Sequence, residues 1–180
     1  MMKKLGMGLA FLAVVLLPAG AWATIIADAF FTYTPLSGPG TVTVHSWVED
    51  LAPTAALYRY NYQILDPSVN IQWFSAELLP NAAIVNWATY TGLPGEPALW
   101  APNGIGTSFD ATFINPILAP GGKSAVLWFD SPQKPTTADG MAAGFTGGYK
   151  AFYGNLYTPV PEPTTLLLLA AGAIGLLRKK

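Results

Sequence analysis

Hydrophobic and polar side chains alternate with a period of two along the middle of this chain. In YRYNYQI (58–64), three tyrosines and an isoleucine alternate with arginine, asparagine and glutamine. This period predicts a β-strand with one buried face and one solvent-exposed face. In SVNIQWFSAEL (68–78) the alternation changes phase, which predicts a β-bulge near Trp73.

Turn-forming residues separate several further segments of this kind. Strand patterns cover residues 23–33, 41–49, 107–114, 124–130 and the glycine-rich 143–157. Turn signals lie between the strands at SGPG, DPS, LPGEP, APNG, APGG, SPQKP and ADG. The segment 81–90 fits either a strand or a short helix. Short strands with dense turns predict an antiparallel β-sandwich.

Residues 1–23 have a different pattern, that of a secretory signal peptide. A pair of lysines precedes an apolar run (5–17), and Ala21 and Ala23 form a small-x-small cleavage site. Cleavage after Ala23 would begin the mature chain at Thr24. An uncleaved signal anchor is the alternative. In both cases we expect the chain from Thr24 onward to leave the cytoplasm.

A second apolar run lies in residues 159–180. Pro161, Glu162 and Pro163 precede fourteen uncharged residues (164–177), and the cations that follow are Arg178, Lys179 and Lys180. As a helix this run is about 21 Å long, against a hydrocarbon core of roughly 30 Å. The cations stay on the cytoplasmic side and stop transfer. We therefore predict a short, temporary membrane anchor, with an ordinary single-pass anchor as the alternative.

The segment VPEPTTLLLLAAGAIGLLRKK resembles the PEP-CTERM sorting signal of Gram-negative bacteria. Its Pro-Glu-Pro motif, apolar run and basic end follow the order of that family, although the tip is Arg-Lys-Lys where the family favours arginines. The resemblance implies export by the Sec machinery, a transient stay in the inner membrane and cleavage near the motif by an exosortase-type enzyme. The product would reach the cell surface or the extracellular matrix.

Residues 24–158 form one predicted exported domain of 135 residues. This segment has four Lys and Arg side chains against nine Asp and Glu, a net charge of −5, whereas the whole chain carries −1. An acidic domain argues against binding to nucleic acid or anionic lipid. The sequence has no cysteine, so we expect neither a disulfide framework nor a thiol nucleophile.

Residues 55–135 also resemble the immunoglobulin-like sandwiches of exported bacterial surface proteins. The resemblance rests on Tyr-x-Tyr-x-Tyr, IQWF and LAPGGKSAVLWFDSPQKP, and it implies a fold without implying a function. The expected fold class is therefore all-β: an immunoglobulin-like antiparallel β-sandwich flanked by an N-terminal signal helix and a C-terminal sorting helix.

The predicted domain contains no clear catalytic constellation. His45 is the single histidine, and we expect it to be structural or exposed. The PGGKSAV segment around Ser124 lacks a glycine required by a P-loop and one required by a nucleophile elbow. We predict no catalytic residue, metal or cofactor. A calcium site and a glycosidase pair stay open as alternatives to a solvated surface for Asp28, Glu49, Asp50, Asp110, Asp130 and Asp139.

Aromatic residues are the remaining candidates for a binding role. Rings on an exposed sheet face can stack on sugars, and Trp73, Trp87 and Trp100 are the candidates for contact with an exopolysaccharide. The alternative is a place in the core, which applies equally to Tyr58, Tyr60, Tyr62, Trp128, Tyr149, Tyr153 and Tyr157.

These observations predict a non-enzymatic exported protein of the cell surface or matrix. The alternatives are a carbohydrate-binding module and a secreted hydrolase. Exposed aromatic rings would favour the module, and two carboxylates converging in a concave site would favour the hydrolase.

Overall fold

The computed structural model describes residues 23–52, 55–89, 95–114, 117–145 and 148–160. The described segments contain ten β-strands, all paired antiparallel. The strands are β1 (Thr24–Pro35), β2 (Val42–Asp50), β3 (Tyr58–Leu65), β4 (Ile71–Glu77), β5 (Asn86–Thr89), β6 (Leu99–Pro102), β7 (Ser108–Thr112), β8 (Leu127–Ser131), β9 (Pro135–Phe145) and β10 (Tyr149–Pro159). The predicted all-β class is confirmed, whereas the two flanking helices lie outside the described residues.

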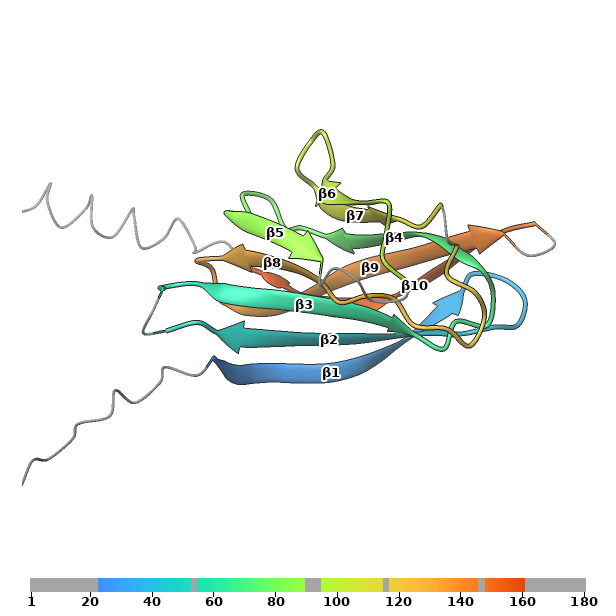
Figure 1. The fold of residues 1–180 in the computed structure, drawn as a ribbon, viewed down its shortest axis with the longest axis horizontal. Helices are drawn as coiled ribbons and strands as arrows, with labels where there is room; N and C mark the ends of the chain where they lie inside the picture. Colours follow the sequence, from blue (N-terminus) through green and yellow to red (C-terminus); the bar gives the residue numbers. More distant parts are fainter. Residues whose placement is uncertain (1–22, 53–54, 90–94, 115–116, 146–147, 161–180) are drawn as a thin grey trace, which may run out of the picture.

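The ten strands form one continuous sheet in the order β5-β8-β3-β2-β1-β10-β9-β4-β7-β6. The sheet curls on itself until its two outermost strands, β5 and β6, come close together, which gives a nearly closed, barrel-like shape (Figure 1). We call β5, β8, β3, β2 and β1 the first half-sheet, and β10, β9, β4, β7 and β6 the second half-sheet.

The prediction of an immunoglobulin-like sandwich is wrong, because β1 joins the two half-sheets. Most of β1 pairs with β2, but at its end Thr34 pairs with Tyr153 and Pro35 with Phe152 of β10. A long twisted strand can leave one half-sheet and continue in the other. The period-two pattern predicts strands and their faces, but it carries no information on which edges pair.

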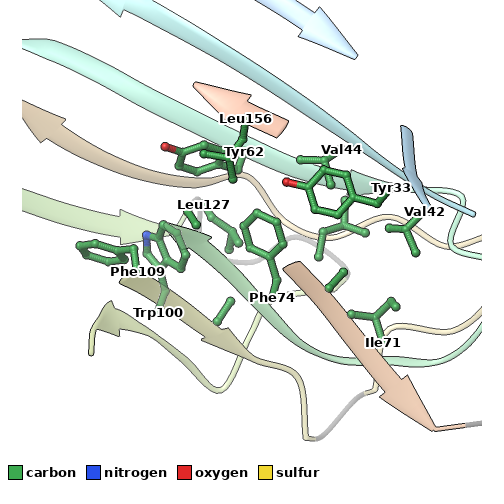
Figure 2. Close-up of a cluster of buried hydrophobic side chains, with 14 of the residues drawn as sticks. Tyr33, Val42, Val44, Tyr62, Ile71, Phe74, Trp100, Phe109, Leu127 and Leu156 are labelled. Atoms are coloured by element: carbon green, nitrogen blue, oxygen red, sulfur yellow. The ribbon is translucent and has the colours of Figure 1, made fainter. Parts of the chain in front are cut away.

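Aromatic side chains fill the space between the half-sheets (Figure 2). Tyr62 of the first half-sheet meets Phe74 and Trp100 of the second at ring-centroid distances of 6.1 Å in both cases. Phe109 stacks on Phe129 at 5.1 Å. Tyr60 and Tyr62 are fully buried, as their alternation predicts, while Tyr58 is half-buried.

Gly140 and Gly154 make room for the ring of Tyr33. The two glycines are paired neighbours on β9 and β10. A Cβ on Gly140 would lie 2.1 Å from the Tyr33 hydroxyl, and a Cβ on Gly154 would lie 2.2 Å from the ring. The predicted turn at ADG (138–140) is therefore wrong, since Gly140 serves this close approach inside a strand.

The β-bulge predicted near Trp73 is confirmed. The pairing of β4 with β9 shifts register between Ile71 and Trp73. Ile71 and Phe74 consequently both point into the core, while Trp73 lies on the outer face of the second half-sheet. The ambiguous segment 81–90 contains strand β5, and the glycine-rich 143–157 contributes to two strands, β9 and β10.

Candidate functional site

Three adjoining hollows lie on the outer face of the second half-sheet. The acid hollow has a volume of about 360 Å³ and is lined by Ser75, Glu77, Ser108, Asp139, Met141 and Tyr153, among others. The aromatic hollow, of about 460 Å³, is lined by Trp73, Thr112, Ile114, Ile117, Phe145 and Tyr149, among others. The third hollow, of about 280 Å³, includes Leu36, Tyr149, Lys150 and Tyr153.

These hollows follow one another along the strands of the second half-sheet. Trp73, Ser75 and Glu77 alternate along β4 on its outer side, so the step from the aromatic hollow to the acid hollow is two residues. The distance from Trp73 to Glu77 along an extended strand is about 14 Å. Tyr149 borders the aromatic and third hollows, and Tyr153 borders the third and acid hollows. We call the combined surface the groove.

Exposed aromatic rings form one end of the groove. Phe145 and Tyr149 meet edge to face with ring centroids 5.4 Å apart, and they are 53% and 60% exposed. They sit on either side of the connection between β9 and β10, where Tyr149 pairs with Phe145. Adjoining aromatic surfaces that are exposed to water mark places where a partner can bind. This end of the groove is therefore suited to a ligand with flat apolar faces.

Carboxylate and hydroxyl groups line part of the other end. Asp110 accepts hydrogen bonds from the hydroxyls of Ser75 (2.7 Å) and Ser108 (2.8 Å). The exposed Glu77 and Asp139 side chains have no hydrogen bond or ion pair to another described residue. The hydroxyl protons of Ser75 and Ser108 are used on Asp110, so these two groups and the two carboxylates offer acceptor oxygens, while the hydroxyls of Thr107 and Tyr153 in the same lining can still donate.

The structure separates the three tryptophans proposed for sugar stacking. Trp73 lines the aromatic hollow. Trp87 is 46% exposed on the terminal strand β5, where its ring packs edge-on against Phe109 at 5.8 Å. Trp100 is 7% exposed, and its Nε1 donates a hydrogen bond to the Trp128 carbonyl at 2.9 Å. Trp100 thus has no free face for a ligand.

His45 lies on the outer face of the first half-sheet, away from the groove. Its ring stacks between Phe30 and Trp47 at 4.2 Å and 4.5 Å, and its Nε2 is 2.7 Å from the Oδ1 atom of Asp28. Ser124 is buried, and its hydroxyl donates to the Ala125 carbonyl and accepts from the Ile64 amide. These two residues are not arranged as a nucleophile and its base.

The remaining predicted carboxylates are engaged in structural contacts. Asp130 binds Arg59 in a bidentate ion pair (2.8 and 3.1 Å). Glu49 accepts a hydrogen bond from the Trp47 indole, and Asp50 accepts one from the Ala52 amide. Within the described residues, no group of three or more His, Cys, Asp or Glu side chains is placed to hold a metal ion.

The sequence pattern did not predict which residues lie next to Trp73 and Asp139 in the groove. Glu77 lies beside Asp139 in the lining of one hollow, and Tyr149 lies with Trp73 in another. The alternation of Trp73, Ser75 and Glu77 was a usable signal that these three share a face. The neighbours from β9 and β10 could not be found this way, because strand order is non-local.

The described segments contain no helix with the length and apolar character needed to cross a membrane. The last described strand, β10, ends at Pro159, and Val160 still donates a hydrogen bond to the Lys134 carbonyl at 2.9 Å. The folded chain thus leads straight into the segment with the sorting pattern. Together these features define an all-β domain joined to a protein-sorting segment.

Residues 159–180 match the family model of the PEP-CTERM protein-sorting motif, so this is a PEP-CTERM domain-containing protein. The motif implies an exported protein that is processed by an exosortase and sorted through the membrane to the cell surface. The match covers the sorting segment and leaves the β-domain without an assigned family. No curated protein and no solved structure matches the chain significantly.

Proposed function

We propose that residues 24–158 form a non-enzymatic module that is displayed at the cell surface or in the extracellular matrix and binds a saccharide polymer in the groove. The observation that carries this proposal is the set of rings around the aromatic hollow: Phe145 and Tyr149 are exposed, and Trp73 is half-buried in its lining. Sugar rings have flat C–H faces that pack on aromatic planes and hydroxyls that bind polar side chains. The groove offers both kinds of surface within one open face.

The shape of the groove favours a chain over a compact ligand. Its hollows adjoin along β4, β9 and β10, and Tyr149 and Tyr153 stand at the borders between them. A small molecule would be enclosed on most sides in its pocket. A surface that is open along the strands can instead hold successive rings of a polymer.

Delivery follows from the sorting segment in this proposal. The Sec machinery exports the precursor, the signal peptide is removed after Ala23, and the inner membrane holds the precursor until an exosortase cuts near Pro161, Glu162 and Pro163. Backbone pairing extends to Val160, and Pro159 is buried. A cut in or beyond the motif therefore leaves all ten strands intact.

A binding assay on the full-length protein in detergent tests the saccharide site. We expect retardation by some members of a panel of soluble polysaccharides in affinity electrophoresis. Trp73→Ala and Tyr149→Ala should each weaken binding about tenfold, which corresponds to ~1.4 kcal/mol, because each removes an apolar ring face from the contact.

Phe30→Ala is the matched control, since Phe30 is a 64% exposed aromatic on the other half-sheet. Its affinity should equal that of the unchanged protein. The proposal fails if no polysaccharide retards the protein, or if the Phe30 variant loses as much affinity as the two groove variants.

A secreted glycosidase is the second candidate, and one observation favours it. Glu77 and Asp139 line the same hollow, and two carboxylates on either side of a sugar bond can act as acid and base. If polysaccharides that bind are also cut, new reducing ends appear with time. Glu77→Gln and Asp139→Asn would each abolish their release while leaving binding in place.

A further inference from the structure

We propose that the groove selects saccharides that carry free amino groups, with the ammonium in the acid hollow and another ring of the same saccharide chain against the aromatic hollow. This inference rests on the proposed saccharide-binding function and names the class of sugar that the groove takes. It follows from the juxtaposition of the carboxylates of Glu77 and Asp139 with the rings of Trp73 and Tyr149 along the same strands.

The hydrogen-bonding character of the acid hollow calls for a donor-rich ligand. The hydroxyls of Ser75 and Ser108 donate to Asp110, so toward a ligand they present lone pairs. Glu77 and Asp139 add four carboxylate oxygens, and a carboxylate is an acceptor only. An ammonium group has three donors and no acceptor. It matches this hollow better than a hydroxyl, which is both donor and acceptor, or an acetamide, which carries no charge.

Charge complementarity points to the same ligand. No described Lys or Arg side chain lines the acid hollow. Lys150 lines the third hollow instead, and its Nζ already donates to the Pro39 carbonyl at 3.0 Å. The segment 24–158 as a whole carries a charge of −5. Its field attracts a polycation and repels saccharides built from uronic acids.

The spacing of the two ends sets the geometry of binding. Trp73 and Glu77 lie about 14 Å apart along β4, too far for a single sugar ring to touch both. Between them the outer face is polar at Ser75 and apolar at Met141, and these two residues are paired neighbours. An oligosaccharide of several rings can therefore place one ring on the aromatic residues while an amine farther along reaches the carboxylates.

Calorimetry on the full-length protein in detergent tests this selectivity with three hexasaccharides: a glucosamine hexamer with free amines, its N-acetylated counterpart and a uronic acid hexamer. At pH 6 and low salt, we expect the free-amine hexamer to bind at least tenfold more tightly than the acetylated one, with no binding of the uronate. The preference should shrink as salt rises. The double variant Glu77→Gln, Asp139→Asn should remove the preference while retaining affinity for the acetylated hexamer.

A charge-matched control separates a local effect from a global one. The double variant Asp28→Asn, Glu49→Gln also removes two negative charges, but from the first half-sheet. There the Asp28 side chain is exposed and the Glu49 side chain is half-buried. That variant should keep the full preference for amines. If it loses the preference as the groove variant does, the effect is one of overall charge and the inference is overturned.

The outcomes distinguish this inference from the proposed function. Equal binding of the free-amine and acetylated hexamers overturns the selectivity and leaves saccharide binding standing. Both proposals are supported if Trp73→Ala loses affinity for the free-amine and acetylated hexamers while the unchanged protein prefers the free-amine hexamer. Absence of binding to all three hexamers and to every polysaccharide in the panel overturns both. Binding of a divalent cation to the acid hollow in place of the amine, seen as competition by Ca²⁺ at millimolar concentration, would also contradict the assignment.

Discussion

At the scale of single residues, two buried tyrosine hydroxyls behave differently. The hydroxyl of Tyr62 donates to the Tyr157 carbonyl at 2.7 Å. The hydroxyl of Tyr33 is buried with no hydrogen-bond partner among the described residues, in the space left by Gly140 and Gly154. A buried donor without a partner is costly, while a satisfied one contributes to stability. The two tyrosines therefore form a matched pair for mutation to phenylalanine.

We expect Tyr62→Phe to lower the free energy of unfolding by about 1–2 kcal/mol, because it leaves the Tyr157 carbonyl without its donor. Tyr33→Phe should be neutral or stabilising by up to ~1 kcal/mol, because it removes an unsatisfied group and keeps the ring. Urea titration of both variants measures the difference. A larger loss for Tyr33→Phe than for Tyr62→Phe would contradict the hydrogen-bond assignment.

The same tyrosines predict an alkaline limit to stability. Burial, with a smaller contribution from the charge of Asp139, raises the pKa of the Tyr33 hydroxyl well above its ordinary value of 10.0. Burial also raises the pKa of Tyr62, with Tyr60 and Tyr33 adding to the effect. Above pH ~10 the unfolded chain loses these protons while the folded chain keeps them. Stability is therefore intact below pH ~10 and falls as the pH rises beyond it.

Each such tyrosine contributes a slope of about 1.4 kcal/mol per pH unit above pH ~10. Unfolding free energies measured across this range should fall less steeply for Tyr33→Phe than for the unchanged protein. Parallel slopes for the two proteins would show that Tyr33 ionises in the folded state as readily as in the unfolded chain.

At the scale of elements, a side-chain clamp supports the pairing of β3 with β8. Arg59 and Asp130 are paired neighbours on these strands, and the guanidinium of Arg59 lies 3.9 Å from the centroid of the Trp128 ring. The Asp130 side chain is 4% exposed, against 24% for Arg59. A buried carboxylate that loses its cation is far more costly than the intact pair is stabilising.

Arg59→Ala should accordingly destabilise the protein by about 3 kcal/mol. Adding Asp130→Asn to this variant should recover part of the loss, since it removes the uncompensated charge. Thermal and urea unfolding of the single and double variants measure the coupling. A double variant less stable than Arg59→Ala would contradict a role for charge compensation.

The elements also show where sequence-based prediction succeeds and where it stops. The alternation in 58–64 predicted β3 and its buried face, and the phase change predicted the bulge at Trp73, because both are local consequences of side-chain period. The prediction of a turn at 138–140 was wrong because Gly140 makes room for the side chain of Tyr33, which is far away in sequence. The groove needs Trp73 of β4 beside Phe145 of β9 and Tyr149 next to it, and that juxtaposition depends on strand order.

At the scale of the whole molecule, the described chain begins and ends at the same end of the barrel-like sheet. β1 starts opposite Asp50, at the end where Pro159 pairs with Pro135 (Figure 1, left). The Thr158 hydroxyl donates to the Glu77 carbonyl at 2.9 Å. The acid hollow is consequently nearer to this end, and the aromatic hollow is farther from it.

Mass spectrometry of surface and membrane fractions tests the processing. We expect surface protein to end between Pro161 and Thr164, because backbone pairing holds the chain through Val160 and the motif follows. Changing Pro161, Glu162 and Pro163 to alanine should leave full-length protein in the inner membrane. Recovery of a peptide containing Leu177 from most of the surface protein would contradict cleavage at the motif.

The central claim is that the groove holds the exported protein in a saccharide matrix. Its most direct test is the distribution of the protein between matrix and medium, quantified by immunoblotting. The cells make either the unchanged chain or the double variant Trp73→Ala, Tyr149→Ala, and the Phe30→Ala variant is the control. We expect the unchanged protein and the control to stay in the matrix, while the double variant moves into the medium with its fold intact. Retention of the folded double variant at the level of the unchanged protein would contradict it.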